Sequence, residues 1–253
     1  MNRHFVRGLL GAGFLGCAMI WTIPGGAADP KGGLDESDTK AVMEFNAKIL
    51  KDTLAQTKVP KPMKLRAATA AKMVALAAQT GGSARNAQMA TIRDAALKIA
   101  EAIENDKLDD ARAQTKDLMS MKADENAKLD GVKIIDKQLK LDDIMNQYAG
   151  ERGGGLAIED KLEEWDDKGL PDKLDKVEET AEQMYVIFEA VRSHAANTKL
   201  GTQAEWDKFS DQARSRTFEL RDAAKKGDKV LSQKALVSVM KCCEECHKTF
   251  RPR

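Results

Sequence analysis

The chain ends in a Cys-x-x-Cys-His run, and no other feature of the sequence limits its possible folds as strongly. The run consists of Cys243, Cys246 and His247, close to the end of a chain of 253 residues. This spacing is typical of covalent haem attachment, in which two thiols add to the porphyrin vinyl groups and the histidine ligates the iron. On a helix, successive residues are about 100° apart, so all three side chains share one face. We therefore predict one haem c per chain, with His247 as the proximal iron ligand.

The same residues could serve two other uses. Cys242 precedes the motif, so Cys242, Cys243, Cys246 and His247 offer four possible zinc ligands. A closed zinc site usually draws its ligands from separated segments, and the chain has no second Cys/His cluster. A redox dithiol is expected within a βαβ pattern, which this sequence lacks. Haem attachment is the preferred interpretation, and it leaves Cys242 as a single thiol, most simply buried on a neighbouring helix face.

The N-terminus is predicted to be a signal peptide, residues 1–28. A basic start at residues 3–7 precedes an apolar stretch at residues 8–23, and small residues at Gly26 and Ala28 suit cleavage by signal peptidase. We expect a periplasmic or otherwise exported protein that has no stable membrane span after cleavage.

Two alternatives concern the same N-terminal segment. A permanent membrane anchor is disfavoured because the apolar stretch is short and rich in glycine. Cys17 follows Phe14-Leu15-Gly16, a weak match to a lipoprotein cleavage site, so lipid anchoring at Cys17 is a minority alternative.

Composition favours helices and argues against nucleic acid as a partner. The chain carries 41 Lys+Arg against 40 Asp+Glu, so no bulk positive field would attract a polyanion. Aromatic residues make up only 5 %, while Ala, Lys, Asp, Glu and Leu dominate, a mixture that suits helices better than strands. We predict an all-α protein.

Apolar residues recur at helical spacing along the whole chain after the signal peptide. The expected helices fall into two sets of four, at residues 35–54, 63–80, 84–104 and 108–129, and then at 132–148, 172–197, 202–226 and 230–250, with a short amphipathic piece at 158–167. We predict two tandem antiparallel four-helix bundles, at 29–130 and 131–253, the second carrying the haem. The first is interpreted as a degenerate repeat that binds no haem, because Met121–Glu125 stands in the place of the motif.

The C-terminal part resembles the class II c-type cytochromes, the cytochrome c-prime family. The motif near the end of the chain and the following Phe250 and Arg251 match the family's last helix, and Trp206 and Phe209 resemble its third helix. The resemblance implies a four-helix bundle with thioether bonds at Cys243 and Cys246 and proximal ligation by His247. It also implies that Phe250 packs on the haem and that Arg251 lies near the proximal imidazole.

In this family the distal residue comes from the first helix of the bundle. The resemblance therefore makes Met145, or alternatively Ile144, the candidate on the distal side of the haem. His194 is the other histidine outside the signal peptide, and a histidine near a helix end is more often solvated or capping than ligating.

The function expected from these features is single-electron transfer through the haem, without enzymatic activity, to a redox partner protein that the sequence does not identify. The first alternative is binding or sensing of a diatomic gas, NO or CO. The second is that the haem-free half is a module that docks onto the redox partner.

Overall fold

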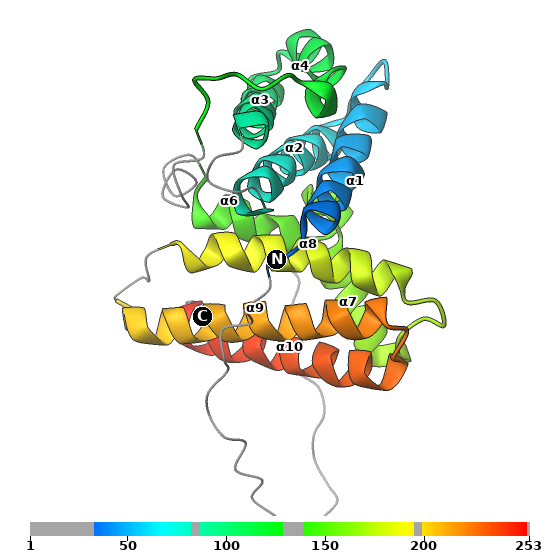
Figure 1. Cartoon of the computed structure of the whole chain (residues 1–253), viewed down its shortest axis with the longest axis vertical. Helices are drawn as coiled ribbons and strands as arrows, with labels where there is room; N and C mark the ends of the chain where they lie inside the picture. Colours follow the sequence, from blue (N-terminus) through cyan, green and yellow to red (C-terminus); the bar gives the residue numbers. More distant parts are fainter. Residues whose placement is uncertain (1–32, 82–86, 129–138, 195–198, 252–253) are drawn as a thin grey trace, which may run out of the picture.

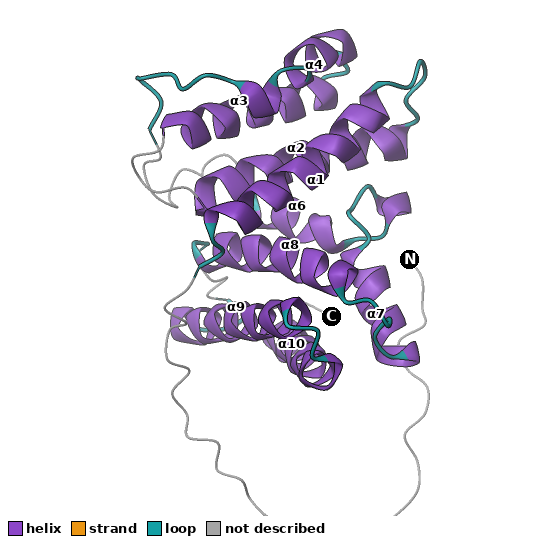
Figure 2. Cartoon of the chain, turned by 45° about the vertical axis from the view of Figure 1, so that its right-hand side comes forward, coloured by secondary structure: helices purple, strands orange, loops and turns teal. Residues whose placement is uncertain are grey.

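The computed structural model describes residues 33–81, 87–128, 139–194 and 199–251, and within them all regular secondary structure is helical, as predicted (Figure 2). The predicted signal peptide, Cys17 and the segment 132–138 lie outside the described residues.

The N-terminal helices are α1 (Glu36–Leu54), α2 (Lys61–Gly81), α3 (Ala87–Glu104) and α4 (Leu108–Thr115). The first three lie close to their predicted positions. Asp35 caps α1, because its carboxylate accepts a hydrogen bond from the Asp38 amide at 2.8 Å and so satisfies one of the unpaired N–H groups of the first turn. Pro62 occupies the first turn of α2, where a missing N–H costs nothing.

The predicted fourth helix, residues 108–129, is much shorter in the structure. α4 ends at Thr115, a 3-10 turn η1 follows at Leu118–Ser120, and residues 121–124 have no regular structure. Only Ala111 of α4 is buried, so this segment lacks the apolar stripe that stabilises a longer helix. The segment is fixed to α3 by a hydrogen bond, which the Thr91 hydroxyl accepts from the Asp124 amide at 2.9 Å. Met121–Glu125 therefore forms no helix that corresponds to the one carrying the haem motif.

The C-terminal half is built on three long helices, α8 (Asp175–Arg192), α9 (Gln203–Lys225) and α10 (Lys229–Phe250). The shorter α7 (Ile158–Lys168) precedes them, and its range agrees with the predicted amphipathic piece. α9 begins with a capping box, in which the Thr202 hydroxyl accepts from the Glu205 amide at 3.2 Å and the Glu205 carboxylate accepts from the Thr202 amide at 2.8 Å.

The predicted helix 132–148 is confirmed only in part over its described residues. Lys140 is extended, α6 covers only Leu141–Met145, and 3-10 turns follow as η2 (Asn146–Tyr148) and η3 (Glu151–Gly153). The chain then folds back, because the Leu156 amide donates to the Gln147 carbonyl at 2.9 Å. Gly155 permits this close return: a Cβ there would lie 2.0 Å from the Ala149 carbonyl oxygen.

The long helices stack as successive layers (Figures 1 and 2). α1 and α3 pack on α2, α1 and α2 contact α8, and α9 lies between α8 and α10. α2 is central in its half and is buried on most sides by small side chains such as Ala67, Ala71 and Ala78, which let neighbouring helices approach. One continuous hydrophobic core includes residues of both halves. The domain boundary near residue 130 stays a prediction.

Candidate functional site

The Cys-x-x-Cys-His motif lies in the last turns of α10. The helix begins at the Asp228 cap, whose carboxylate accepts from the Leu231 amide at 2.9 Å, and continues through Phe250. Val239 and Leu236 are fully buried against the core and fix which side of α10 faces inward. Cys243 follows Val239 by one turn, so the rotation of α10 directs this thiol inward.

The cysteines of the motif are half-buried free thiols. Cys242, Cys243 and Cys246 are not joined in disulfides, and all three pack against the core. Burial, with smaller contributions from Cys242 and Cys246, raises the pKa of Cys243 to about 12. Burial, then Cys242, raises the pKa of Cys246 to about 11. Both groups therefore remain neutral thiols at physiological pH, and little charge opposes an apolar neighbour at this face.

His247 lies next to these thiols at the edge of the site and is exposed to solvent. Partial loss of solvation and the positive charge of Arg251 lower the pKa of His247, while Glu159 of α7 opposes that shift. The neutral imidazole, which is the form that ligates metals, is favoured. Arg251 also stays close through its backbone, since its amide donates to the His247 carbonyl at 3.0 Å.

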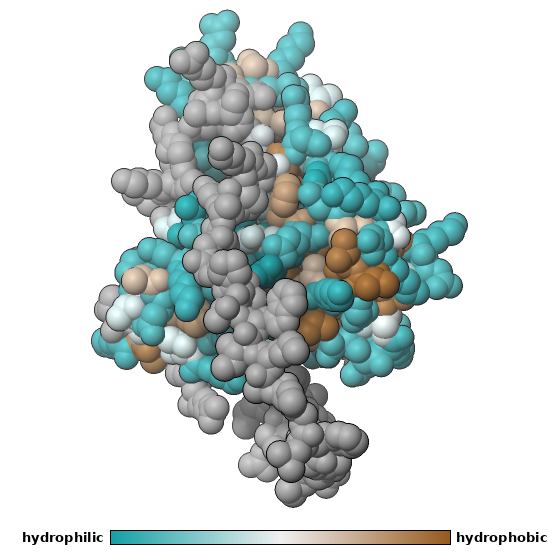
Figure 3. Space-filling model, turned by 60° about the horizontal axis from the view of Figure 1, so that its bottom comes forward, coloured by the Kyte–Doolittle hydropathy of each residue, from teal (hydrophilic) through white to brown (hydrophobic). Residues whose placement is uncertain are grey.

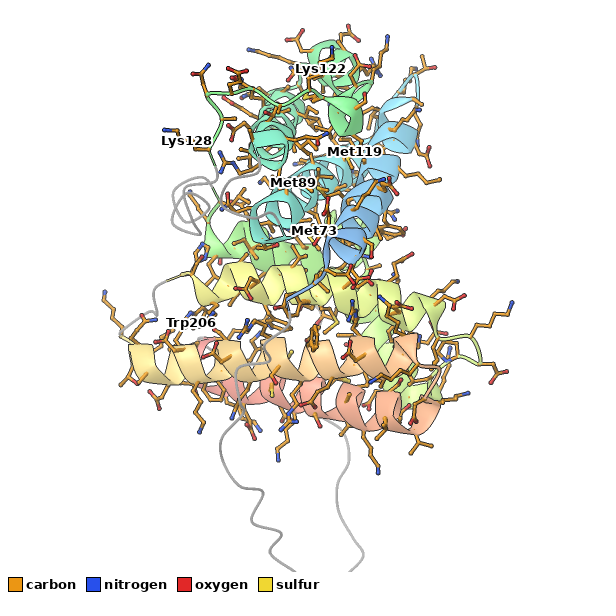
Figure 4. All side chains as sticks on the ribbon, in the orientation of Figure 1. Met73, Met89, Met119, Lys122, Lys128 and Trp206 are labelled. Carbon is orange, nitrogen blue, oxygen red and sulfur yellow. The ribbon has the colours of Figure 1, made fainter. Side chains whose placement is uncertain are left out.

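Aromatic rings close the end of the site at Phe250. Its ring centroid lies 5.1 Å from that of Trp206 and 6.3 Å from that of Phe209, both edge-on. Trp206 is held in place because its indole N–H donates to the Val191 carbonyl at 3.3 Å. Side chains from α9 and α10 thus meet at the end of the motif, held by a backbone carbonyl of α8. Trp206 lies on α9 near the C-terminal end of α10, whereas Met73, Met89 and Met119 lie among the N-terminal helices (Figure 4).

Tyr148 is a residue of the site that the sequence reasoning missed. Its hydroxyl is buried and has no hydrogen-bond partner among the described residues, and its ring lies 5.8 Å from that of Phe188. Burial, with a smaller effect of the nearby Cys243, raises the pKa of Tyr148 well above its ordinary value. One signal was present in the sequence: the chain has only two tyrosines, and this one ends the apolar stripe of its segment.

The two distal candidates lie just before Tyr148 in the chain. Ile144 is fully buried on α6, which packs on α8. Met145 is half-buried against the core. The structure does not test which side chain faces the iron, so Met145 stays a predicted distal residue.

Both ring nitrogens of His194 are occupied. Nδ1 lies 3.1 Å from the Ala190 carbonyl oxygen, and Nε2 lies 3.1 Å from the Leu139 carbonyl oxygen. The imidazole thus joins the end of α8 to the segment before α6, which is a structural role.

The residues around the motif fit a covalently bound haem. Cys243 and Cys246 present half-buried thiols on one helix face, His247 is one position further, and Tyr148 offers a buried hydroxyl without a partner. Aromatic and aliphatic side chains provide the apolar surroundings that a porphyrin needs. In the described ranges, no group of three or more His, Cys, Asp or Glu side chains is arranged to hold a metal ion.

Comparison with known proteins agrees with this geometry. Residues 141–251, which span α6 to the end of α10, match a family model described as cytochrome C'. No curated protein and no solved structure matches the chain. The match supports a c-type haem protein with a haem cofactor, as predicted from the motif and the resemblance. The match does not include the N-terminal helices, and nothing in it supports a degenerate repeat there. The C-terminal region of the chain, residues 141–251, is cytochrome c-prime-like.

Proposed function

We propose that the chain is an exported, periplasmic single-electron carrier and not an enzyme. The observation that carries the proposal is the placement of Cys243 and Cys246 as half-buried free thiols on the inward face of α10, within the family match. The haem bound there would supply an iron that changes oxidation state. We propose one haem c per chain, with thioether bonds at both thiols and with His247 as the proximal ligand.

The protein's own residues would hold the group and control its surroundings. The apolar side chains near the motif keep water away and lower the local dielectric, which is one of the factors that set a haem reduction potential. Phe250, supported by Trp206 and Phe209, provides a fixed aromatic surface at the end of α10. Arg251 contributes a positive charge near His247 and favours the neutral imidazole. Glu159 brings an opposing negative charge from α7.

Export remains part of the proposal because the basic and apolar start of the sequence has the form of a signal peptide. Among the described helices, none combines the length and the apolar character that crossing a membrane requires.

Gas binding is the second candidate function, and the site gives it specific support. His194 is the other described histidine and a possible nitrogen ligand, but both of its ring nitrogens lie at backbone carbonyl groups. It is therefore not placed to occupy the iron. If Met145 does not ligate the iron, the sixth position is open to NO or CO. The buried Tyr148 hydroxyl near Cys243 is a polar group that such a site could use.

A redox titration and a carbon monoxide spectrum of the purified protein test these functions together. The protein should be matured in a host that attaches haem c. Reversible reduction within the physiological range supports the carrier, and a haem that cannot be reduced in that range contradicts it. A change in the ferrous spectrum on adding carbon monoxide supports gas binding, while a six-coordinate ferrous spectrum that ignores the gas excludes it.

The docking role of the haem-free half is a third proposal, and the structure changes how it should be tested. Deleting residues 29–130 would expose core side chains of α8, because α1 and α2 pack on that helix. Charge reversal of exposed residues on α3 and α4, such as Lys98→Glu, keeps the core intact. Slower electron exchange with the native partner and an unchanged haem spectrum would support docking by these helices.

A further inference from the structure

A shallow groove lies between α9 and α10. Its volume is about 460 Å³. The apolar part of its lining comes from Phe218, Ala223, Leu231 and Ala235, contributed by both helices. The Phe218 ring is held from behind, because it packs 5.8 Å from the Tyr185 ring and the Arg221 guanidinium lies 5.4 Å from its centre. The floor of the α9/α10 groove is therefore fixed by packing.

Exposed apolar side chains lie in this groove and next to it on α10: Leu231 lines the groove, Val230 directly precedes Leu231, and Val237 directly precedes Ser238, which also lines it. Val230 is 66 % exposed, Leu231 52 % and Val237 51 %. These three are the majority of the large apolar side chains exposed in the described part of the chain, since only Leu65 and Leu200 join them. Figure 3 shows apolar surface gathered on the face where α10 lies. A concentration of apolar surface on one helix face is typical of an interaction site.

In the described part of the chain, the acidic side chains that line the groove form ion pairs, whereas two of its lysines do not. Glu219 pairs with Arg216 at 2.8 Å, and Asp222 pairs with Arg221 at 2.5 Å. Lys226 and Lys234 are exposed and have no acidic partner within 4.0 Å among the described residues. The charge left without a partner at the rim is therefore positive, and an anionic surface would complement it.

The unpaired positive charge favours an acidic partner over a second copy of this chain as the protein that binds the groove. A second copy of the chain would bring its own unpaired lysines to the same interface, because a twofold contact presents the same patch twice. An acidic partner would bring carboxylates to both lysines and would cover Val230, Leu231 and Val237 with apolar side chains.

We propose that the α9/α10 groove, bordered by Val230, Leu231, Val237 and the unpaired Lys226 and Lys234, docks a partner protein through an apolar projection flanked by carboxylates. The surface continues along the helix that carries the haem motif. Cys243 follows Val237 by six positions, or about 9 Å of helix. A bound partner would lie beside the haem end of α10. That the bound partner exchanges electrons with the haem rests on the proposed carrier function, whereas binding at the groove does not depend on it.

Fluorescence anisotropy with the haem-loaded protein tests the surface. The probe is a fluorescein-labelled amphipathic helical peptide with a leucine stripe bordered by glutamates, compared with a counterpart that has lysines in place of the glutamates. We expect the acidic peptide to bind, the basic one to bind at least about 10-fold more weakly, and added salt to weaken the acidic complex. Val237→Asp and the pair Lys226→Glu with Lys234→Glu should each weaken binding of the acidic peptide by about 10-fold or more.

Control substitutions of the same kind outside the groove show whether weaker binding comes from the groove itself or from any change of charge or loss of an exposed apolar side chain. Leu65→Asp removes an exposed apolar side chain from α2, and Lys58→Glu reverses an exposed charge just after α1; neither should change binding. Equal affinity for both peptides, absence of binding, or equal losses in the controls would overturn the proposal. A dimer in sedimentation velocity that Val237→Asp dissociates would also overturn it, by making a second copy the occupant. The haem spectrum of each sample reports the proposed function separately, so failure of one proposal leaves the other intact.

Discussion

Arg221 of α9 and Asp38 of α1 form a buried ion pair between the N-terminal and C-terminal halves of the chain. Both side chains are almost fully enclosed, with 8 % and 7 % exposed. Lys225 also reaches Asp38 at 2.9 Å, and Glu182 of α8 lies 4.0 Å from Arg221. The pair thus ties the first N-terminal helix to the helices that support the haem motif.

Removing Arg221 should destabilise the fold strongly. Arg221→Met leaves Glu182 without its nearest cation and Asp38 with Lys225 alone, and breaking a buried pair from one side costs about 3–5 kcal/mol. Urea unfolding followed by circular dichroism measures the change. Arg216→Met is the matched control, because Arg216 is 39 % exposed in its pair with Glu219 and such a pair contributes at most about 1 kcal/mol. An equal loss of unfolding free energy in both variants would show that the buried ion pair contributes no more stability than the exposed one.

Glu182 should make stability depend on pH. Burial, then the negative charge of Glu178, raises the pKa of Glu182 from 4.5 to about 7, although Lys225 acts in the opposite direction. A carboxyl whose pKa is raised on folding favours the folded state while it is protonated. That contribution is complete below pH 4.5 and is lost as pH rises to about 7.

The neutral variant Glu182→Gln isolates this effect. It should be more stable than the parent by about 1–3 kcal/mol above pH 7, with the advantage disappearing near pH 4.5. Urea unfolding at a series of pH values provides the measurement, and Glu163→Gln, at an exposed position of α7, is the control. A difference that does not vary with pH would contradict the proposed titration.

The three adjacent thiols should differ in their role in haem attachment. Cys246→Ala should leave at most one thioether bond, which shifts the absorption of the pyridine haemochrome, because each saturated vinyl group changes the porphyrin spectrum. Cys242→Ala should leave attachment unchanged, since Cys242 lies outside the Cys-x-x-Cys-His spacing. Loss of haem in Cys242→Ala and its retention in Cys246→Ala would reassign the thioether positions.

Tyr148 should be tested in the protein without haem. Tyr148→Phe removes a buried hydroxyl that has no partner among the described residues, so we expect stability to rise by about 1 kcal/mol or to stay unchanged. Thermal or urea unfolding of the haem-free chain measures this. Destabilisation by more than about 1 kcal/mol would mean that the hydroxyl has a polar partner even without the cofactor.

The sequence determined the helices that have strong local signals. α1, α3, α9 and α10 lie within a few residues of their predicted ranges, because apolar periodicity and caps such as Asp35, Thr202 and Asp228 act between residues close in the chain. The haem-attachment motif could also be predicted from the sequence, because its chemistry depends on five consecutive residues.

Only the tertiary structure decided what depends on long-range packing. The segment up to Tyr148 reads as one α-helix, but α6 ends at Met145 and a 3-10 turn follows. The chain then folds back through the hydrogen bond from the Leu156 amide to the Gln147 carbonyl, which a local pattern cannot foresee. Three other features likewise bring together residues far apart in the chain or on separate helices: the proximity of Tyr148 to Cys243, the pairing of Arg221 with Asp38, and the groove lined by Leu231. Periodicity fixes which side of a helix is apolar, whereas the partner that covers that side follows from how all the helices together exclude water.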